Sequence, residues 1–169
     1  MWNATPTTVI FNFDGGSNAQ RNAASAAMDM WNSVKHASTG ANLVTMNLST
    51  SVDTNNDIFF SARLGYFGAF GETLYTYQEG SSTILESVDV ELNSKYSWGT
   101  TGGSGVDVQT IVGHELGHAL GVAHCHAIGE SSCFSATCST NLMNPAWGVG
   151  DVVHSLTSYD ISSYQLIYY

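Results

Sequence analysis

The sequence predicts an α+β fold in which a mixed β-sheet packs against helices. Five short segments within the first 93 residues are rich in β-branched and aromatic side chains, a composition typical of strands. Apolar residues recur at helical spacing in two longer segments, one after the first of these strands and one after the last. A length of 169 residues, 43% of them hydrophobic, indicates a single domain with a sizeable core.

The first half of the chain consists of a strand, a helix and further strands. Residues 7–13 (TTVIFNF) predict the first strand, and Ser17 with Gln20 forms a capping-box pattern at the start of the first helix. That helix should end before Gly40, and its apolar residues at helical spacing are Ala24, Ala27, Met28, Trp31 and Val34. Strands two to five are predicted at residues 41–48, 56–62, 73–78 and 86–93.

The second half begins with another predicted helix and ends with a short one. Residues 98–105 form a glycine-rich loop before Asp107, the expected N-cap of the second helix, and Gly121 stands where that helix should stop. Residues 122–155 show no periodicity, so we expect a long irregular segment, and segments of this kind tend to be functional. The pattern Thr157–Asp160 predicts the cap of a last short helix.

The charge of the chain excludes two classes of partner. Four Lys and Arg residues against fourteen Asp and Glu residues give a net charge of −10. Binding to a nucleic-acid backbone or to an anionic membrane needs a basic face, so we expect neither partner. The sequence also has no stretch close to the roughly 18–20 consecutive apolar residues that a membrane span requires.

The three cysteines indicate an oxidising compartment. Cys125, Cys133 and Cys138 allow at most one intrachain disulfide, and the sequence does not choose among the three possible pairs. A disulfide that pins a loop suits a secreted protein, whereas a zinc–thiolate site would favour Cys-x-x-Cys spacing, which is absent. The first residues, MWNATPTT, lack the basic and apolar regions of a signal peptide. Either a cytosolic protein or a mature fragment of a secreted one would begin in this way, and we expect the second.

The strongest functional signal is the segment HELGHALGVAH, residues 114–124. His114 and His118 are four residues apart, which places both imidazoles on one face of the predicted second helix. An unbroken helix would carry His124 to a different face, but Gly121 can adopt positive φ and turn the chain so that His124 approaches the other two. Three neutral imidazoles with a fourth position left open are typical of catalytic zinc.

Glu115 adds the chemistry of hydrolysis to this predicted zinc site. It follows His114 directly and should project beside a zinc-bound water, whose pKa falls to about 7. Glu115 can accept a proton as that water attacks a carbonyl and then pass the proton to the leaving amine. The motif therefore predicts metal-assisted hydrolysis of an amide bond.

The extended pattern His-Glu-x-x-His-x-x-Gly-x-x-His resembles the signature of the metzincin metalloproteases. Within that group the chain is most similar to the matrixins, the catalytic domains of matrix metalloproteases and their microbial relatives. The segment TNLMNPAW resembles the methionine turn beneath the metzincin zinc, with Met143 as the matching residue. The same resemblance implies that Pro145 and Trp147 line the S1′ pocket, with Trp147 in place of the usual tyrosine.

The resemblance extends over nearly the whole domain and implies its architecture. The segment around Trp31 and the ending that contains Asp160 are similar to the first and last matrixin helices. The implied fold is a twisted, mostly parallel five-stranded sheet with an antiparallel edge strand, two long helices and an irregular C-terminal subdomain ending in a short helix. Residues 1–121 and 122–169 would be the two subdomains of one catalytic domain.

The chain departs from the matrixin pattern at three points. The structural zinc of many matrixins is not expected, because residues 59–98 contain no histidine. Calcium binding has no motif behind it, although Asp89, Glu91 and backbone carbonyls offer oxygen ligands. Cys125 replaces the usual serine after the third histidine and leaves the subfamily open, while Pro145, in place of a zinc-binding tyrosine, argues against astacins and serralysins.

These observations predict a secreted, monomeric zinc endopeptidase that cleaves protein or peptide substrates with Glu115 as general base. The substrate is expected to lie extended along an edge strand, assigned to residues 73–78 with Tyr75 and Tyr77. The predicted S1′ pocket favours a hydrophobic P1′ residue. Two alternatives stay open: an inactive zinc-bearing binding module, which would have no need of Glu115, and a different hydrolysis on the same ion, such as deacetylation of small molecules.

Overall fold

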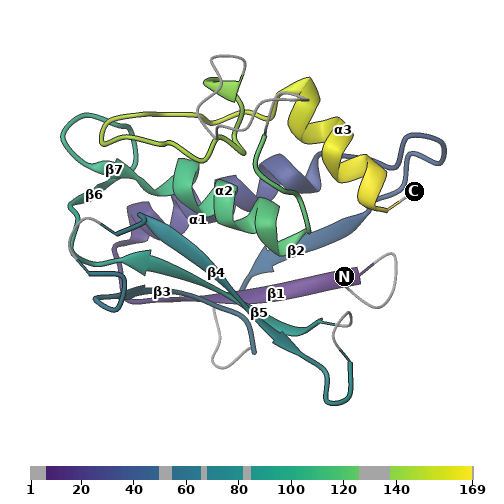
Figure 1. Cartoon of the computed structure of the whole chain (residues 1–169), viewed down its shortest axis with the longest axis horizontal. Helices are drawn as coiled ribbons and strands as arrows, with labels where there is room; N and C mark the ends of the chain where they lie inside the picture. The colour runs from purple at the N-terminus through teal and green to yellow at the C-terminus, as the bar shows by residue number, and fades with distance from the viewer. Residues whose placement is uncertain (1–6, 50–54, 66–67, 82–84, 126–137, 169) are drawn as a thin grey trace.

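The computed structural model describes residues 7–49, 55–65, 68–81, 85–125 and 138–168. In this part of the chain the elements are β1 (Thr7–Asp14), α1 (Asn18–Asn32), β2 (Val44–Leu48), β3 (Asp57–Ser61), β4 (Gly71–Tyr77), β5 (Leu85–Asn93), β6 (Trp98–Gly99), β7 (Val106–Asp107), α2 (Val108–Ala119) and α3 (Ser158–Ile167). The fold is α+β as predicted, with α1 and α2 lying over one face of the main sheet (Figure 1).

The main sheet has five strands in the order β2-β1-β3-β5-β4. Pairs β1–β2, β1–β3 and β3–β5 are parallel, and β4 pairs with β5 in antiparallel orientation at the edge. The predicted mostly parallel sheet with one antiparallel edge strand is therefore confirmed. Residues 73–77 lie in that edge strand, as expected, and Thr73 pairs with Val90 of β5.

The core lies between the sheet and the helices. Val9, Phe11 and Phe13 of β1 are buried and alternate with more exposed residues, as expected for a strand with one covered face. The buried face of α1 packs above them and carries Ala23, Ala24, Ala27, Met28 and Trp31. Ser17 and Gln20 form the predicted capping box at the start of α1.

Trp31 joins three elements that are distant in sequence. Its indole Nε1 donates a hydrogen bond to the carbonyl of Gly113 in α2 at 2.8 Å, and its ring meets Tyr164 of α3 edge-on, with centroids 5.5 Å apart. The hydroxyl oxygen of Tyr164 accepts a bond from the amide of Val44 at the start of β2, at 3.1 Å. These contacts fix α3 against α1 and the sheet, so the segment between α2 and α3 has two anchored ends.

The first helix is shorter than its apolar pattern predicts. It ends at Asn32 with Ser33 as C-cap, so Val34 lies beyond it, although Val34 is buried as expected. The reason is a tertiary contact at the helix end. The side-chain Nδ2 of Asn32 donates to the main-chain carbonyl of Met46, and its Oδ1 accepts from the main-chain amide of Met46, both at 2.7 Å. These two bonds tie the end of α1 to β2.

The loop predicted at residues 98–105 is irregular only from Thr100 onward. Trp98 and Gly99 form β6, which pairs in parallel with β7, because the chain turns back through glycine-rich residues to the start of α2. Between Val122 and Leu156 the described residues form neither an α-helix nor a strand, as predicted for this irregular segment. In the part of the chain that is described, no helix has the length and apolar character needed to cross a bilayer.

Candidate metal centre

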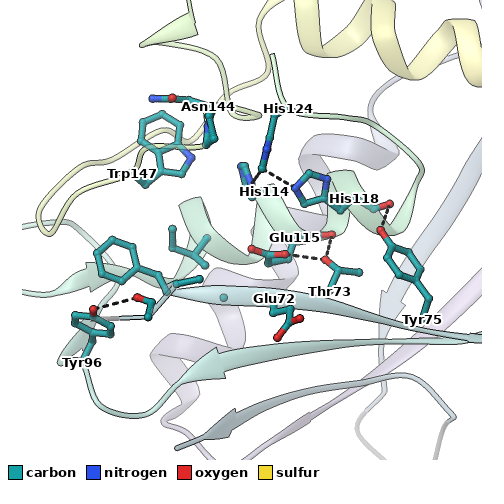
Figure 2. Close-up of a pocket in the computed structure, with 16 residues that line it drawn as sticks. Glu72, Thr73, Tyr75, Tyr96, His114, Glu115, His118, His124, Asn144 and Trp147 are labelled. Carbon is teal, nitrogen blue, oxygen red and sulfur yellow. Dashed lines mark hydrogen bonds between the residues drawn. The ribbon is translucent and has the colours of Figure 1, made fainter. Parts of the chain in front are cut away.

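The three histidines predicted to bind metal converge on one point (Figure 2). The Nε2 atom of His124 lies 3.1 Å from Nε2 of His114 and 3.0 Å from Nε2 of His118. Nitrogen ligands at roughly 2.0–2.1 Å from a tetrahedral ion are separated from one another by roughly 3.3–3.4 Å. The spacing is therefore close to that of three ligands sharing one metal ion, and the described residues contain no other such group.

The end of α2 brings the third histidine to the other two. Asp107 caps the helix through a 2.8 Å bond from the amide of Thr110, as predicted. At the other end Gly121 has φ of +90°, and the amides of Gly121 and Val122 bond to the carbonyls of His118 and Gly117 at 2.7 and 2.9 Å. This is a Schellman motif, and it reverses the chain direction so that His124 returns to the helix.

The hydrogen bonds of the two helical histidines leave their Nε2 atoms as electron-pair donors. Nδ1 of His114 lies 2.8 Å from the carbonyl of Leu142, and Nδ1 of His118 lies 2.8 Å from the carbonyl of Val122. A carbonyl only accepts, so each Nδ1 carries the proton and each Nε2 is free of one. A proton on Nε2 of His124 could form a hydrogen bond to only one of the two neighbouring Nε2 atoms. A cation can bind all three Nε2 atoms, so this set of nitrogen ligands fits a metal ion.

Burial keeps these imidazoles in the neutral form that metals require. The pKa of His114 is lowered to about 3, mainly by burial; the neighbouring His118 and His124 act in the same direction, and the hydrogen bond to the Leu142 carbonyl acts against them. Burial also lowers the pKa of His118. Both side chains are therefore uncharged at neutral pH and need not lose a proton to bind an ion.

Glu115 lies in the same cavity as the three histidines and is only 6% exposed. Its Oε2 lies 2.8 Å from the Thr73 hydroxyl of the edge strand, which is also 2.9 Å from the Glu115 carbonyl. The pKa of Glu115 is raised to about 7, mainly by burial; the Thr73 hydrogen bond acts in the opposite direction and the charge of Glu72 acts in the same direction as burial. A carboxyl group with a pKa near 7 can both accept and release a proton, as a general base and acid must.

The cavity has a volume of about 540 Å³ and is bounded by β4 on one side and by residues 144–147 on the other. Pro145, Trp147 and Tyr75, three of the residues predicted to bind substrate, line it. Tyr77 does not line it. Together with Tyr75 and His118, it borders a second cavity of about 290 Å³ beside the end of α2. Tyr75 and Tyr77 are two residues apart and share one face of β4, so Tyr77 lies further along the strand from the first cavity.

Several residues that line the first cavity were not predicted from the sequence to belong to the site. They are Gly68, Ala69, Phe70, Gly71, Glu72, Thr73, Tyr96, Ile111 and Asn144. Ile111 precedes His114 by three residues, so helical spacing could have placed it on the same face of α2. Phe70 comes just before β4 and Tyr96 just after β5, and their rings meet edge-on at a centroid distance of 4.7 Å. This contact depends on the pairing of the two strands and not on a local sequence pattern.

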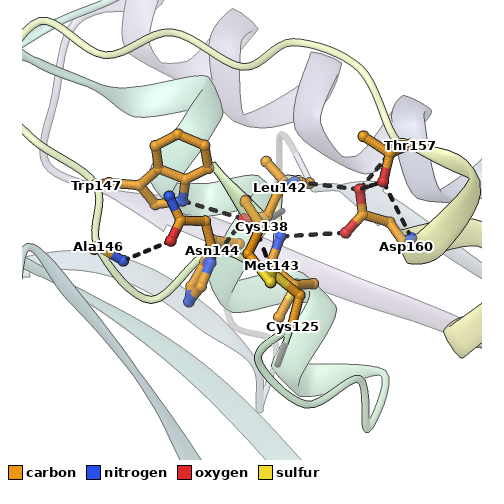
Figure 3. The surroundings of a disulfide bond; sticks show 10 residues. Cys125, Cys138, Leu142, Met143, Asn144, Ala146, Trp147, Thr157 and Asp160 are labelled. Carbon is orange, nitrogen blue, oxygen red and sulfur yellow. Dashed lines mark hydrogen bonds between the residues drawn. A yellow bond between two sulfur atoms is a disulfide. The ribbon is translucent and has the colours of Figure 1, made fainter. Parts of the chain in front are cut away.

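Met143, the residue predicted to form a methionine turn, lies against α2. It is fully buried, and a side chain at Gly117 would overlap its sulfur atom. Its main chain is held from two sides (Figure 3). The carboxylate of Asp160 accepts the Met143 amide at 3.2 Å, and the Met143 carbonyl accepts the amide of Cys125, next to His124, at 2.9 Å.

One of the three possible cysteine pairs is formed, between Cys125 and Cys138 (Figure 3). Cys133 lies outside the described residues. The bond joins the residue after His124 to the segment that leads into Met143, and both sulfur-bearing residues are buried. The disulfide therefore belongs to the support of the third histidine.

Asp89 and Glu91, the oxygen ligands considered for calcium, have other partners. Asp89 accepts the amide of Asp57 at 2.9 Å, and Glu91 accepts the guanidinium Nε of Arg63 at 2.7 Å. Neither residue belongs to a cluster of metal-binding side chains within the described ranges.

No protein-family model matches this chain, and no curated protein matches it.

Proposed function

We propose that this protein is a secreted, monomeric zinc endopeptidase of the matrixin-like metzincin type. One observation carries the proposal: the Glu115 carboxylate lines the same open cavity as three histidines whose Nε2 atoms converge. A metal-binding module needs the histidines alone, whereas a hydrolase also needs a group that moves protons. The buried disulfide between Cys125 and Cys138 supports the secreted location.

Zinc is the metal that we assign to this site. Imidazole also suits copper, nickel and iron, but a set of three histidine nitrogens that converge beside an open cavity is typical of catalytic zinc. The carbonyls of Leu142 and Val122 orient His114 and His118, as outer partners of zinc ligands do. When bound, zinc supplies Lewis-acid chemistry, which makes water more acidic and polarises a carbonyl.

Glu115 supplies the proton transfer. Its Oε2 is engaged by Thr73, so we assign the transfer to Oε1. Oε1 accepts a proton from the attacking water and delivers it to the amide nitrogen that leaves. Water is thereby added across the peptide bond, with hydroxide joining the carbonyl carbon and a proton joining the nitrogen, and Glu115 ends in its starting state.

The edge strand β4 is the surface that we assign to the peptide substrate. It pairs with β5 on one side only among the described strands, which leaves its outer edge to bind an extended peptide through main-chain hydrogen bonds. Tyr75 and Tyr77 are 41% and 44% exposed on this strand. The apolar wall formed by Ile111, Pro145 and Trp147 supports a hydrophobic P1′ preference.

A library of peptides with mixed sequences, some carrying acetylated lysine, tests the assignment and separates it from the two alternatives. Zinc-loaded protein, protein treated with a chelator, and protein reloaded with zinc are compared by mass spectrometry of the products. We expect internal cleavage before hydrophobic residues, lost with the chelator and restored by zinc. Zinc binding without any cleavage would favour a binding module, and loss of acetyl groups alone would favour a deacetylase.

A further inference from the structure

We propose that Thr73 is a positioning residue for Glu115. Its hydroxyl holds the Glu115 carboxylate in the orientation that proton transfer requires, within a space that Gly71 leaves open. This inference rests on the proposed function and adds to it the residues that set the geometry of the general base.

The contact joins the edge strand to the metal-binding helix at the one acidic residue of that helix. Thr73 Oγ1 lies 2.8 Å from Oε2 of Glu115 and 2.9 Å from its main-chain oxygen (Figure 2). Thr73 is half-buried and Glu115 is buried, so water does not readily replace this bond. A buried carboxylate without a hydrogen-bond donor is costly, and Thr73 supplies that donor.

The threonine is rigid, which makes it suited to holding a flexible side chain. A β-branched residue in a strand is restricted at χ1, whereas glutamate has three rotatable side-chain bonds. The main chain of Thr73 is fixed by its register opposite Val90 of the neighbouring strand β5. A fixed donor therefore selects one orientation of the mobile carboxylate, which is how proximity effects are obtained in catalysis.

A hydroxyl suits both forms of the carboxyl group. It carries one proton and has two acceptors within reach, the carboxylate Oε2 and the main-chain oxygen of Glu115. While Glu115 is ionised, the hydroxyl donates to the carboxylate. After Glu115 has taken up a proton, the hydroxyl can turn to the main-chain oxygen without movement of the heavy atoms.

Gly71 provides the space for the carboxylate on the other side. A Cβ atom at this position would lie 3.0 Å from Cγ and 3.1 Å from Oε1 of Glu115, and 2.9 Å from Cγ2 of Ile111. Such distances are shorter than ordinary van der Waals contacts, so a larger residue would push the Glu115 side chain away. Gly71 and Thr73 both belong to β4, so the strand that we assign to substrate binding also sets the position of the base.

The first test compares Thr73→Val, which removes the hydroxyl but keeps the shape, with Thr73→Ser, which keeps the hydroxyl. Thr8→Val, at an exposed threonine of strand β1 and outside the strand assigned to the substrate, is the matched control. We expect Thr73→Val to lower kcat by roughly ten- to hundredfold with KM and zinc content nearly unchanged, because only orientation is lost. Thr73→Ser should recover most of kcat. Parental kcat in Thr73→Val, or no recovery in Thr73→Ser, would overturn the proposal.

The second test needs no catalysis and measures the contact itself. Thermal unfolding is followed for Thr73→Val in the parent and in a Glu115→Ala background. The substitution should lower Tm by roughly 2–4 °C in the parent, because it leaves the buried Glu115 carboxylate without its donor. In the Glu115→Ala background no carboxylate is present, so the same substitution should lower Tm by clearly less.

The two tests also separate this inference from the proposed function. If the parent cleaves no peptide, the endopeptidase assignment fails, and the Tm comparison alone decides whether Thr73 holds Glu115. If the parent cleaves and the Tm effect is equal in both backgrounds, the endopeptidase assignment stands and the role of Thr73 is wrong.

Discussion

Two parts of the molecule contribute to the site and hold their residues in different ways. The sheet and α2 place Thr73, His114, Glu115 and His118 through regular main-chain hydrogen bonds. The segment between α2 and α3 contributes His124, Pro145 and Trp147, and its described residues contain neither an α-helix nor a strand. Side-chain hydrogen bonds and a disulfide replace the regular ladder there.

Regular main-chain hydrogen bonds are enough to hold the site residues of the sheet and α2. The segment between α2 and α3 needs additional contacts to hold its own site residues. In α2 the four-residue spacing alone sets His114 and His118 side by side. His124 depends instead on the turn at Gly121, on the Cys125–Met143 main-chain bond and on the disulfide. We therefore expect changes in the irregular segment to loosen the metal centre while the sheet remains folded.

The largest expected effect comes from removing a histidine of either region. His118→Ala and His124→Ala should each lower zinc affinity more than roughly 100-fold, because even a change in an outer partner of a ligand costs 10–100-fold. Competition with a chromophoric chelator measures the affinity, and His36→Ala, in the turn between α1 and β2, is the control. If His124→Ala binds zinc as tightly as the parent, the irregular segment supplies no ligand.

The next largest effect is expected at Asp160, which is fully buried. Its carboxylate accepts the amides of Leu142 and Met143 at 3.2 Å and the amide of Thr157 at 2.8 Å. Asp160→Ala leaves these donors unpaired and should lower the free energy of unfolding by about 3 kcal/mol or more. Urea unfolding measures it against Asp151→Ala, an exposed residue expected to cost under about 1 kcal/mol. Equal losses in the two variants would contradict this role.

Loss of the disulfide should have a somewhat smaller effect. Replacing Cys125 and Cys138 by alanine opens a loop with a sequence separation of 13, which should lower the free energy of unfolding by about 2–3 kcal/mol. Because Cys125 follows His124, zinc affinity should fall as well. Urea unfolding and chelator competition measure the two effects. An unchanged zinc affinity would show that the turn at Gly121 suffices to hold the third histidine.

The smallest expected effect on the metal centre is that of Trp147. Its Nε1 donates to the Leu142 carbonyl at 3.1 Å, which also accepts from His114 at 2.8 Å, so His114 keeps its partner when the indole is removed. Trp147→Ala should therefore leave zinc content unchanged. It should shift the relative kcat/KM for different P1′ residues by roughly tenfold or more, measured with a peptide library. Identical cleavage-site profiles for variant and parent would count against Trp147 as a pocket wall.

Short-range patterns account for what the sequence predicted well. The caps at Ser17, Asp107 and Thr157 each involve a residue three positions further on, and all three are formed. The ligand spacing in α2 and the turn at Gly121 are likewise local, so they follow from helix geometry.

Contacts between distant segments account for what the sequence did not predict. Thr73 and Glu115 are 42 residues apart, and their bond depends on how β4 is placed over α2. The choice of Cys125–Cys138 among three pairs and the early end of α1 at the Asn32–Met46 contact also depend on tertiary packing. Periodicity along the chain carries no information on such pairs.

The central claim is that the three histidines bind zinc and that Glu115 turns this metal centre into a hydrolase. Zinc content and peptide cleavage, measured together for the parent and for Glu115→Ala, test it most directly. We expect both proteins to bind about one zinc ion per chain and only the parent to cleave. A parent without zinc would contradict the metal centre, and zinc in both proteins with cleavage in neither would contradict the hydrolase.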